Sequence, residues 1–382
     1  MANTLELGNG KWATGKDTVL AFNDENNNFK PLPFSFSRDT SGTVVNEEGL
    51  IETVGSGEPR IEFKDNTKGA LLLEPTRGNL FPYSEDFENS DWTKNAGTTI
   101  TNNYAISPDG SLNASRYLGT GTSGLGDKFT LSATSYTISF YIKSNTSENQ
   151  YCRLIGDSSN VSENLLITTE WTRLSYTFTG SGLSNKTNGI FRDSSDNDID
   201  ILIYGAQLEQ GSYATSYIPT SGSAVTRVAD ACNNGGNEQV INSTEGVLYA
   251  CLSDIKSQDF DSIVINNGIA DENNQVRIWF YNNTITYQYK VGSNSSAQIT
   301  TSTIDLTLDT KIACSWKLNE FKLFVNGSKI NQDLLGNVLP IGTLESVQFK
   351  RGNNTGNFYG KTKDIRVYTT ALSDVELTAL TQ

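Results

Sequence analysis

The chain has 382 residues, of which 10% are aromatic and only 19% are charged. This length allows two or three domains with cores of their own, and the composition favours many short strands joined by polar turns over helical bundles or disorder. A formal net charge of −14 disfavours nucleic acids and anionic membrane surfaces as direct partners.

Several classes of site are excluded by what the sequence lacks. It contains no histidine, so a Ser-His-Asp triad, a Cys-His pair and a His-ligated metal are ruled out. A glycosidase needs only two carboxylates, but no acidic residue lies in a distinctive aromatic strand motif, and we expect a protein that is not an enzyme. The cysteines lack metal-binding spacing and are expected to be buried free thiols or, alternatively, to form a disulfide; they are Cys152, Cys232, Cys251 and Cys314.

Residues 1–78 form a string of short apolar pieces separated by polar turns, too small for a core of their own. The predicted strands are Phe34 to Ser37, Gly42 to Asn46, Leu50 to Val54 and Ala70 to Pro75. Such strands can complete the sheet of a partner or a trimer interface, or fold back on the middle of the chain. No apolar signal-peptide core and no stretch of about 18 apolar residues is present, so we expect no membrane insertion.

Residues 79–212 show strands at the spacing of a β-sandwich. The clearest is Tyr136 to Lys143, in which Tyr136, Ile138, Phe140 and Ile142 share one face. The other predicted strands are Thr98 to Asn102, Ser115 to Leu118, Tyr151 to Gly156, Asn164 to Thr168, Thr172 to Thr179 and Asp200 to Gln207. Two such sheets packed face to face form a jelly roll.

A cluster of carboxylates precedes the last of these strands. The segment DSSDNDID makes Asp193, Asp196 and Asp198 candidate ligands of a structural calcium ion, which prefers oxygen donors. The alternative is a solvated acidic loop. After Gly211 the apolar pattern breaks, and Pro219 favours extended geometry at Ile218, which indicates a linker over residues 213–235.

Residues 236–382 predict a second sandwich. Gly246 to Ser253 alternates as a first strand, and Gln275 to Lys290 reads as a hairpin that turns at Asn282 and Asn283, since Asn tolerates positive φ. A second hairpin is predicted around Asn326-Gly327. Ser373, with Glu376 three residues later, predicts a capping box at the start of a C-terminal helix.

The first of these hairpins offers a candidate sugar-binding surface, because sugars bind flat aromatic faces and planar amide or carboxylate groups. Val276, Ile278 and Phe280 share one face of the strand, and the other face carries the candidates. The candidate residues are Trp279, Tyr281, Arg277, Asn282 and Asn283. Alternatively, the two aromatic rings pack under a loop or at an interface between protomers.

Three segments carry a resemblance to a known family. Asn79 to Trp92 (NLFPYSEDFENSDW), Ala105 to Tyr117 (AISPDGSLNASRY) and Tyr204 to Thr220 (YGAQLEQGSYATSYIPT) resemble the carbohydrate-binding-type jelly roll of bacteriophage tail-fibre and head-fibre proteins. Pro33 to Phe63 resembles the lead-in to that module. KLFVNG and the later DIRVYTTALSDVEL are similar to the laminin-G-like, concanavalin-A-like lectin fold.

The resemblance implies an all-β protein with four consecutive parts: a virion-attachment segment (1–78), a jelly roll (79–212), a linker (213–235) and a concanavalin-A-like sandwich (236–382). It also implies a virion surface protein, assembled in the bacterial host cytoplasm, that joins other virion proteins through residues 1–78 and contacts host-surface glycans. Fibres of this kind are usually homotrimers. The alternatives are a purely structural capsid decoration or head-fibre protein and a polysaccharide-degrading tail spike.

Overall fold

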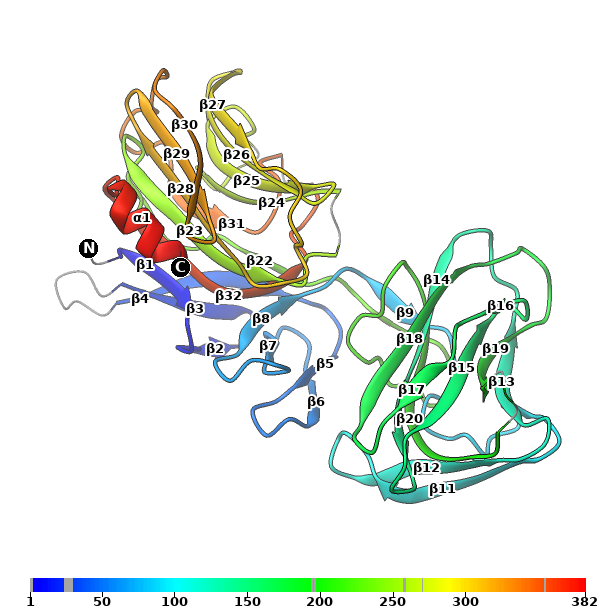
Figure 1. The fold of residues 1–382 in the computed structure, drawn as a ribbon. Coiled ribbons are helices and arrows are strands. Elements are labelled where there is room, and N and C mark those ends of the chain that lie inside the picture. Colours follow the sequence, from blue (N-terminus) through cyan, green and yellow to red (C-terminus); the bar gives the residue numbers. More distant parts are fainter. Residues whose placement is uncertain are drawn as a thin grey trace.

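The computed structural model describes residues 3–23, 30–193, 195, 197–256, 259–269, 271–353 and 355–382. Two β-sandwiches lie beside each other, and the described helix, α1 (Asp374–Thr381), packs on the outside of one of them (Figure 1). Two separate clusters of buried hydrophobic side chains form their cores. The predicted all-β class with two sandwiches is therefore confirmed.

One sandwich, which we call the composite sandwich, is built from both ends of the chain. Its larger sheet has the strand order β22-β4-β3-β1-β32-β23-β28-β29-β30, and its smaller sheet has the order β27-β26-β25-β24-β31. The strands of the larger sheet are β1 (Leu5–Gly8), β3 (Thr18–Asn23), β4 (Lys30–Ser37), β22 (Ala231–Asn233), β23 (Gly246–Ser253), β28 (Thr310–Lys317), β29 (Glu320–Val325), β30 (Ser328–Asp333) and β32 (Gly360–Tyr368), joined at the side by β2 (Thr14–Gly15), β7 (Ile61–Glu62) and β8 (Ala70–Leu73). Those of the smaller sheet are β24 (Asp259–Asn266), β25 (Gln275–Tyr281), β26 (Thr284–Val291), β27 (Asn294–Thr300) and β31 (Ser346–Gln348).

The N-terminal strands belong to this sandwich and not to a separate segment. β1 pairs antiparallel with β32, with Leu5 opposite Val367 and Leu7 opposite Ile365, and all four side chains are in the core. This organisation differs from the four consecutive parts expected from sequence, because the jelly roll is inserted between β8 and β22 of a sandwich that begins and ends the chain.

The inserted jelly roll has a core of its own, lined by the faces that the alternation predicted. Ile138, Phe140 and Ile142 are fully buried, and Trp92 packs 4.7 Å from Phe81, measured between ring centres. One sheet has the order β10-β13-β19-β15-β16 with β17 beside β15, and the other has the order β11-β12-β20-β14-β18. The strands are β10 (Thr93–Lys94), β11 (Thr98–Ile106), β12 (Leu112–Gly119), β13 (Gly124–Phe129), β14 (Ser135–Ser144), β15 (Gln150–Gly156), β16 (Asn160–Val161), β17 (Leu165–Ile167), β18 (Thr172–Thr179), β19 (Lys186–Arg192) and β20 (Ile199–Gln210).

The chain enters and leaves the jelly roll on two paired strands, β9 (Arg77–Asn79) and β21 (Val225–Arg227). The β5–β6 hairpin (Gly42–Val45 and Ile51–Val54) bridges the two sandwiches. The hydroxyl of Thr43 donates to the Tyr217 carbonyl, and the Ile51 amide donates to the Pro108 carbonyl, 2.9 Å away. Part of the N-terminal region therefore does fold back on the jelly roll.

A buried ionic network joins these crossing strands to the N-terminal strands. The carboxylate of Asp230 forms ion pairs with Arg38 (3.0 Å) and Arg60. A second carboxylate, that of Glu74, forms ion pairs with Arg60 (2.7 Å) and Arg227 (2.9 Å). Burial opposes ionisation of Glu74, but Arg227 and Arg60 outweigh it and hold the pKa of Glu74 well below its usual range.

Local signals read from the sequence are confirmed at turns, caps and cysteines. Asn282 and Asn283 have φ values of 46° and 58°, as a tight hairpin turn requires, and Asn326 and Gly327 also have positive φ. Ser373 and Glu376 form the predicted capping box. The four cysteines are buried free thiols.

Candidate functional site

The candidate sugar-binding strand, β25, is oriented as its alternation suggests. Val276, Ile278 and Phe280 are fully buried in the core of the composite sandwich. Trp279 and Tyr281 therefore lie on the outer face of the smaller sheet, where Trp279 is half-buried and Tyr281 is 41% exposed. Asn282 and Asn283 are exposed at the adjacent turn. The structure thus gathers the five candidate residues at one end of one sheet face.

Arg277 holds the indole of Trp279 in place. Its guanidinium lies 4.7 Å from the centre of the Trp279 ring, and its Nε donates to the Ser262 hydroxyl at 3.0 Å. Burial, with a further contribution from the nearby Arg351, lowers the pKa of Arg277 to about 10. A guanidinium stacked on a half-buried indole gives a rigid aromatic platform at low entropic cost.

Amide and hydroxyl groups continue this face across β26 and β27. Thr286 lies opposite Trp279 and Gln288 lies opposite Arg277, and their partners on β27 are Thr300 and Gln298. The two amides are hydrogen-bonded at 3.1 Å and the two hydroxyls at 3.0 Å. An aromatic platform beside an ordered polar row combines the two features that sugar recognition needs.

The candidate calcium loop is held by its own hydrogen bonds. Asp193 is buried and accepts from the Ser195 amide, the Asn197 amide and the Asn197 side chain at 3.1, 3.2 and 2.9 Å. Burial opposes ionisation, but these hydrogen bonds lower the pKa of Asp193 overall. Asp198 is exposed, and Asp196 lies outside the described residues. Among the residues that the structure describes, no group of three or more His, Cys, Asp or Glu side chains is placed to hold a metal ion.

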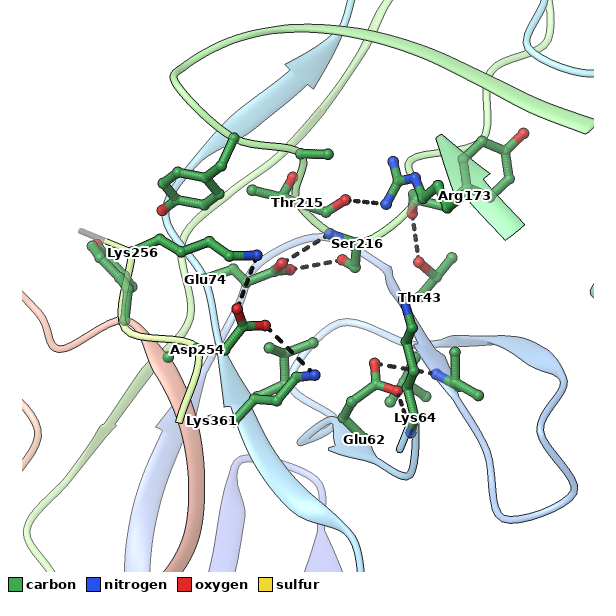
Figure 2. A pocket seen from close by; sticks show the side chains of 18 of the residues that line it. Thr43, Glu62, Lys64, Glu74, Arg173, Thr215, Ser216, Asp254, Lys256 and Lys361 are labelled. Atoms are coloured by element: carbon green, nitrogen blue, oxygen red, sulfur yellow. Dashed lines mark hydrogen bonds and ion pairs between the residues drawn. The ribbon is translucent and has the colours of Figure 1, made fainter. Parts of the chain in front are cut away.

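A cleft that sequence reasoning did not find lies between the two sandwiches (Figure 2). It is a cavity of about 230 Å³. One wall comes from the jelly roll, with Tyr141 on β14 and Arg173 on β18, and the linker adds residues 213–217. The opposite wall comes from the composite sandwich. Its charged residues are Glu62, Lys64, Glu74, Asp254, Lys256 and Lys361.

Charged and aromatic groups in the cleft contact one another across its rim. Asp254 pairs with Lys256 at 2.9 Å and with Lys361 at 3.5 Å. Lys256 also lies 5.5 Å from the centre of the Tyr213 ring, on the linker. Burial raises the pKa of Glu62 even though its carboxylate accepts from the Lys64 amide at 2.8 Å. The cleft is therefore polar, strongly charged and bounded on two sides by the sandwiches.

Comparisons with known proteins give distant fold-level matches. No family model matches the chain, and no curated protein matches it. Among solved structures, the carbohydrate-binding module CBM40 of the Ruminococcus gnavus IT-sialidase, bound to α2,3-sialyllactose, has a TM-score of 0.32 and 15% identity over 39% of this chain and 94% of that one. Domain 4 of the arabinanase AbnA from Geobacillus stearothermophilus, in complex with arabinotriose, has a TM-score of 0.32 and 16% identity over 45% and 83% of the two chains.

A third match is a SAP-like pentraxin from Limulus polyphemus, with a TM-score of 0.30 and 13% identity over 37% of this chain and 71% of that one. These three matches are a carbohydrate-binding module, an arabinanase domain and a pentraxin, and each covers less than half of this chain. Within the described ranges, the protein has no helix with the length and apolar character needed to cross a membrane.

Proposed function

We propose that the protein is a non-enzymatic, glycan-binding surface protein. The observation that carries this proposal is the outer face of β25, β26 and β27, where Trp279 and Tyr281 stand beside rows of amide and hydroxyl groups while the opposite face fills the core. Such a face can stack on the apolar side of a pyranose and bind its hydroxyls.

The resemblance of three segments to bacteriophage fibre modules supports a place for the protein on a virion, with assembly in the bacterial cytoplasm. Multiple copies, in a trimer or on a particle, would make weak binding at single sites effective. Attachment through residues 1–78 would have to use outer surfaces such as Pro33, Ser35 and Ser37, since Phe34 and Phe36 between them are in the core.

The absence of histidine removes the Ser-His-Asp, Cys-His and His-ligated metal designs. Two carboxylates of the cleft are also engaged by cations, Glu74 by Arg60 and Arg227, and Asp254 by Lys256 and Lys361. We expect no reducing ends to be released when the full chain is incubated with host polysaccharides. Their release would favour the tail-spike alternative.

Replacing the aromatic platform tests the proposal. The glycan that binds most tightly would first be found on an array of bacterial surface polysaccharides. Trp279→Ala is expected to weaken the affinity for this glycan by about tenfold or more, equivalent to about 1.4 kcal/mol. The loss follows from removal of the stacking surface. Binding would be measured by titration of the monomeric full-length protein, so that avidity does not hide the change.

Tyr151→Ala is the control, because Tyr151 is an exposed aromatic residue (45%) on β15 of the jelly roll, outside the β25 face. We expect it to bind like the unchanged protein. If the folded protein binds no glycan on the array, adhesion is contradicted and a purely structural role is favoured. Equal loss in both variants would place recognition outside the β25 face.

A further inference from the structure

The cleft between the sandwiches concentrates positive charge on a protein that is strongly acidic overall. The formal net charge of the chain is −14, yet the described lining of the cleft includes four cationic side chains. They are Lys64, Arg173, Lys256 and Lys361. Arg173 belongs to the jelly roll and the three lysines to the composite sandwich, so the two sandwiches together supply these cations (Figure 2).

The carboxylates that line the cleft do not balance this charge. Glu74 is neutralised from behind the wall by Arg60 and Arg227. Asp254 is shared between Lys256 and Lys361. Glu62 accepts from the backbone amides of Val45 and Lys64. The remaining lining therefore has four cations facing two carboxylates, Glu62 and Asp254.

Two of the cations have no carboxylate partner among the residues that the structure describes. Arg173 donates only to neutral acceptors, the Thr215 carbonyl and the Ser139 hydroxyl, and its buried Nε has no hydrogen-bond partner. Lys64 is an exposed residue at the cleft and forms no ion pair with any described residue. Partial burial in the cleft lowers the pKa of Lys64, and the cations Lys361 and Arg173 lower it further against the opposing effects of Asp65 and Glu62.

Mutual repulsion among fixed cations is relieved by an anion bound between them. The hydroxyls of Thr43, Ser175 and Tyr141 add neutral hydrogen-bonding groups to the lining. A volume of about 230 Å³ lies below the range of roughly 300 to 1,000 Å³ for drug-sized ligands, which limits the occupant to about one sugar ring.

We propose that this cleft is a second binding site, distinct from the β25 face, that takes a single acidic sugar unit through its carboxylate. Lys64 and Arg173 would bind the carboxylate from opposite walls, and the hydroxyl groups of the lining would bind the ring. Because the two walls belong to different sandwiches, an occupied cleft also holds the sandwiches together.

The probe is glucuronate, titrated calorimetrically into the full-length protein at low salt. Glucose has the same ring without the charge, and inorganic phosphate has charge without a ring. We expect saturable binding of glucuronate. Its affinity should fall as salt is added, because salt shortens the Debye length to about 10 Å or less and screens the attraction between exposed charges. Glucose is expected not to bind, and phosphate is expected to bind more weakly than glucuronate.

Two substitutions in the cleft should change the affinity in opposite directions. Lys64→Gln is expected to weaken glucuronate binding about tenfold through loss of a charge-assisted hydrogen bond. Glu62→Gln is expected to tighten it, since the amide removes a negative charge that opposes the ligand. Lys16→Gln, an exposed lysine of the same sandwich outside the cleft, makes the same change in net charge and should leave the affinity unchanged.

Opposite shifts from the first two variants, with no shift from the control, support the site, because a merely structural effect would not tighten binding. Phosphate binding as tightly as glucuronate would overturn the sugar assignment. No binding of either anion, or equal loss in Lys64→Gln and Lys16→Gln, would overturn the site. Trp279→Ala should bind glucuronate normally, so failure of the β25 face and failure of the cleft are distinguishable.

Discussion

A fragment of residues 236–382 is expected to remain unfolded when it is produced alone, although the sequence reads as a complete sandwich there. Seven large side chains of the composite core come from the first 73 residues. They are Leu5, Leu7, Val19, Phe34, Phe36, Leu71 and Leu73. At about 1.5 to 3 kcal/mol for each buried side chain, their absence removes roughly 10 to 20 kcal/mol. The whole stability of a domain is about 5 to 15 kcal/mol.

The inserted jelly roll provides the matched comparison. A fragment of residues 76–222 contains every buried side chain of the second core, which runs from Phe81 to Leu208. We expect it to fold alone, with a cooperative thermal transition by circular dichroism and dispersed amide signals by NMR. A cooperative transition from residues 236–382 alone would contradict the composite sandwich.

The elements that sequence predicted well are those fixed by neighbouring residues. The alternation from Tyr136 to Ile142 and from Val276 to Phe280 identified the buried faces of β14 and β25. Period-two patterning works there because successive side chains of a strand point to opposite faces. The turn at Asn282-Asn283 and the Ser373 capping box depend on even shorter segments, and both are present.

Sheet membership was harder to predict because it depends on residues far apart in the chain. The pattern Leu5-Glu6-Leu7 is too short to identify a strand. Nothing in it specifies which strand it pairs with, and its partners Ile365 and Val367 lie about 360 positions later. Periodicity tells which face of a strand is buried and not which strand lies beside it. The insertion of the jelly roll within the other sandwich therefore could not be read from the pattern.

The two candidate sites differ in the same way. The β25 face was predictable because one strand and one turn carry all five candidate residues. The cleft was not, since its cations come from separate segments around Lys64, Arg173, Lys256 and Lys361, each of them ordinary in its own context. A usable signal for the buried network did exist. Arg38 and Arg60 lie in the segment 33–63, where charged residues interrupt apolar runs.

Asp230→Asn is expected to destabilise the composite sandwich by about 3 to 5 kcal/mol, the usual effect of removing one partner from a buried ion pair. The substitution keeps the shape of the side chain and removes its charge. Asp230 and its partners Arg38 and Arg60 are almost completely excluded from solvent. In the variant, Arg38 would lose its only ion pair among the described residues, and Arg60 would keep only the carboxylate of Glu74, which it shares with Arg227. Urea denaturation of the full chain would measure the change.

Asp39→Asn is the control for this experiment, because Asp39 is an exposed carboxylate next to Arg38 and its loss should change stability by no more than about 0.5 kcal/mol. The location of the effect matters as much as its size. Asp230 binds Arg38, Arg60 and the Glu74 amide, none of which belongs to the jelly-roll core. The transition of the composite sandwich should therefore move while that of the jelly roll stays near its original position. An Asp230→Asn variant as stable as Asp39→Asn would mean that the network contributes little to holding the two ends of the chain together.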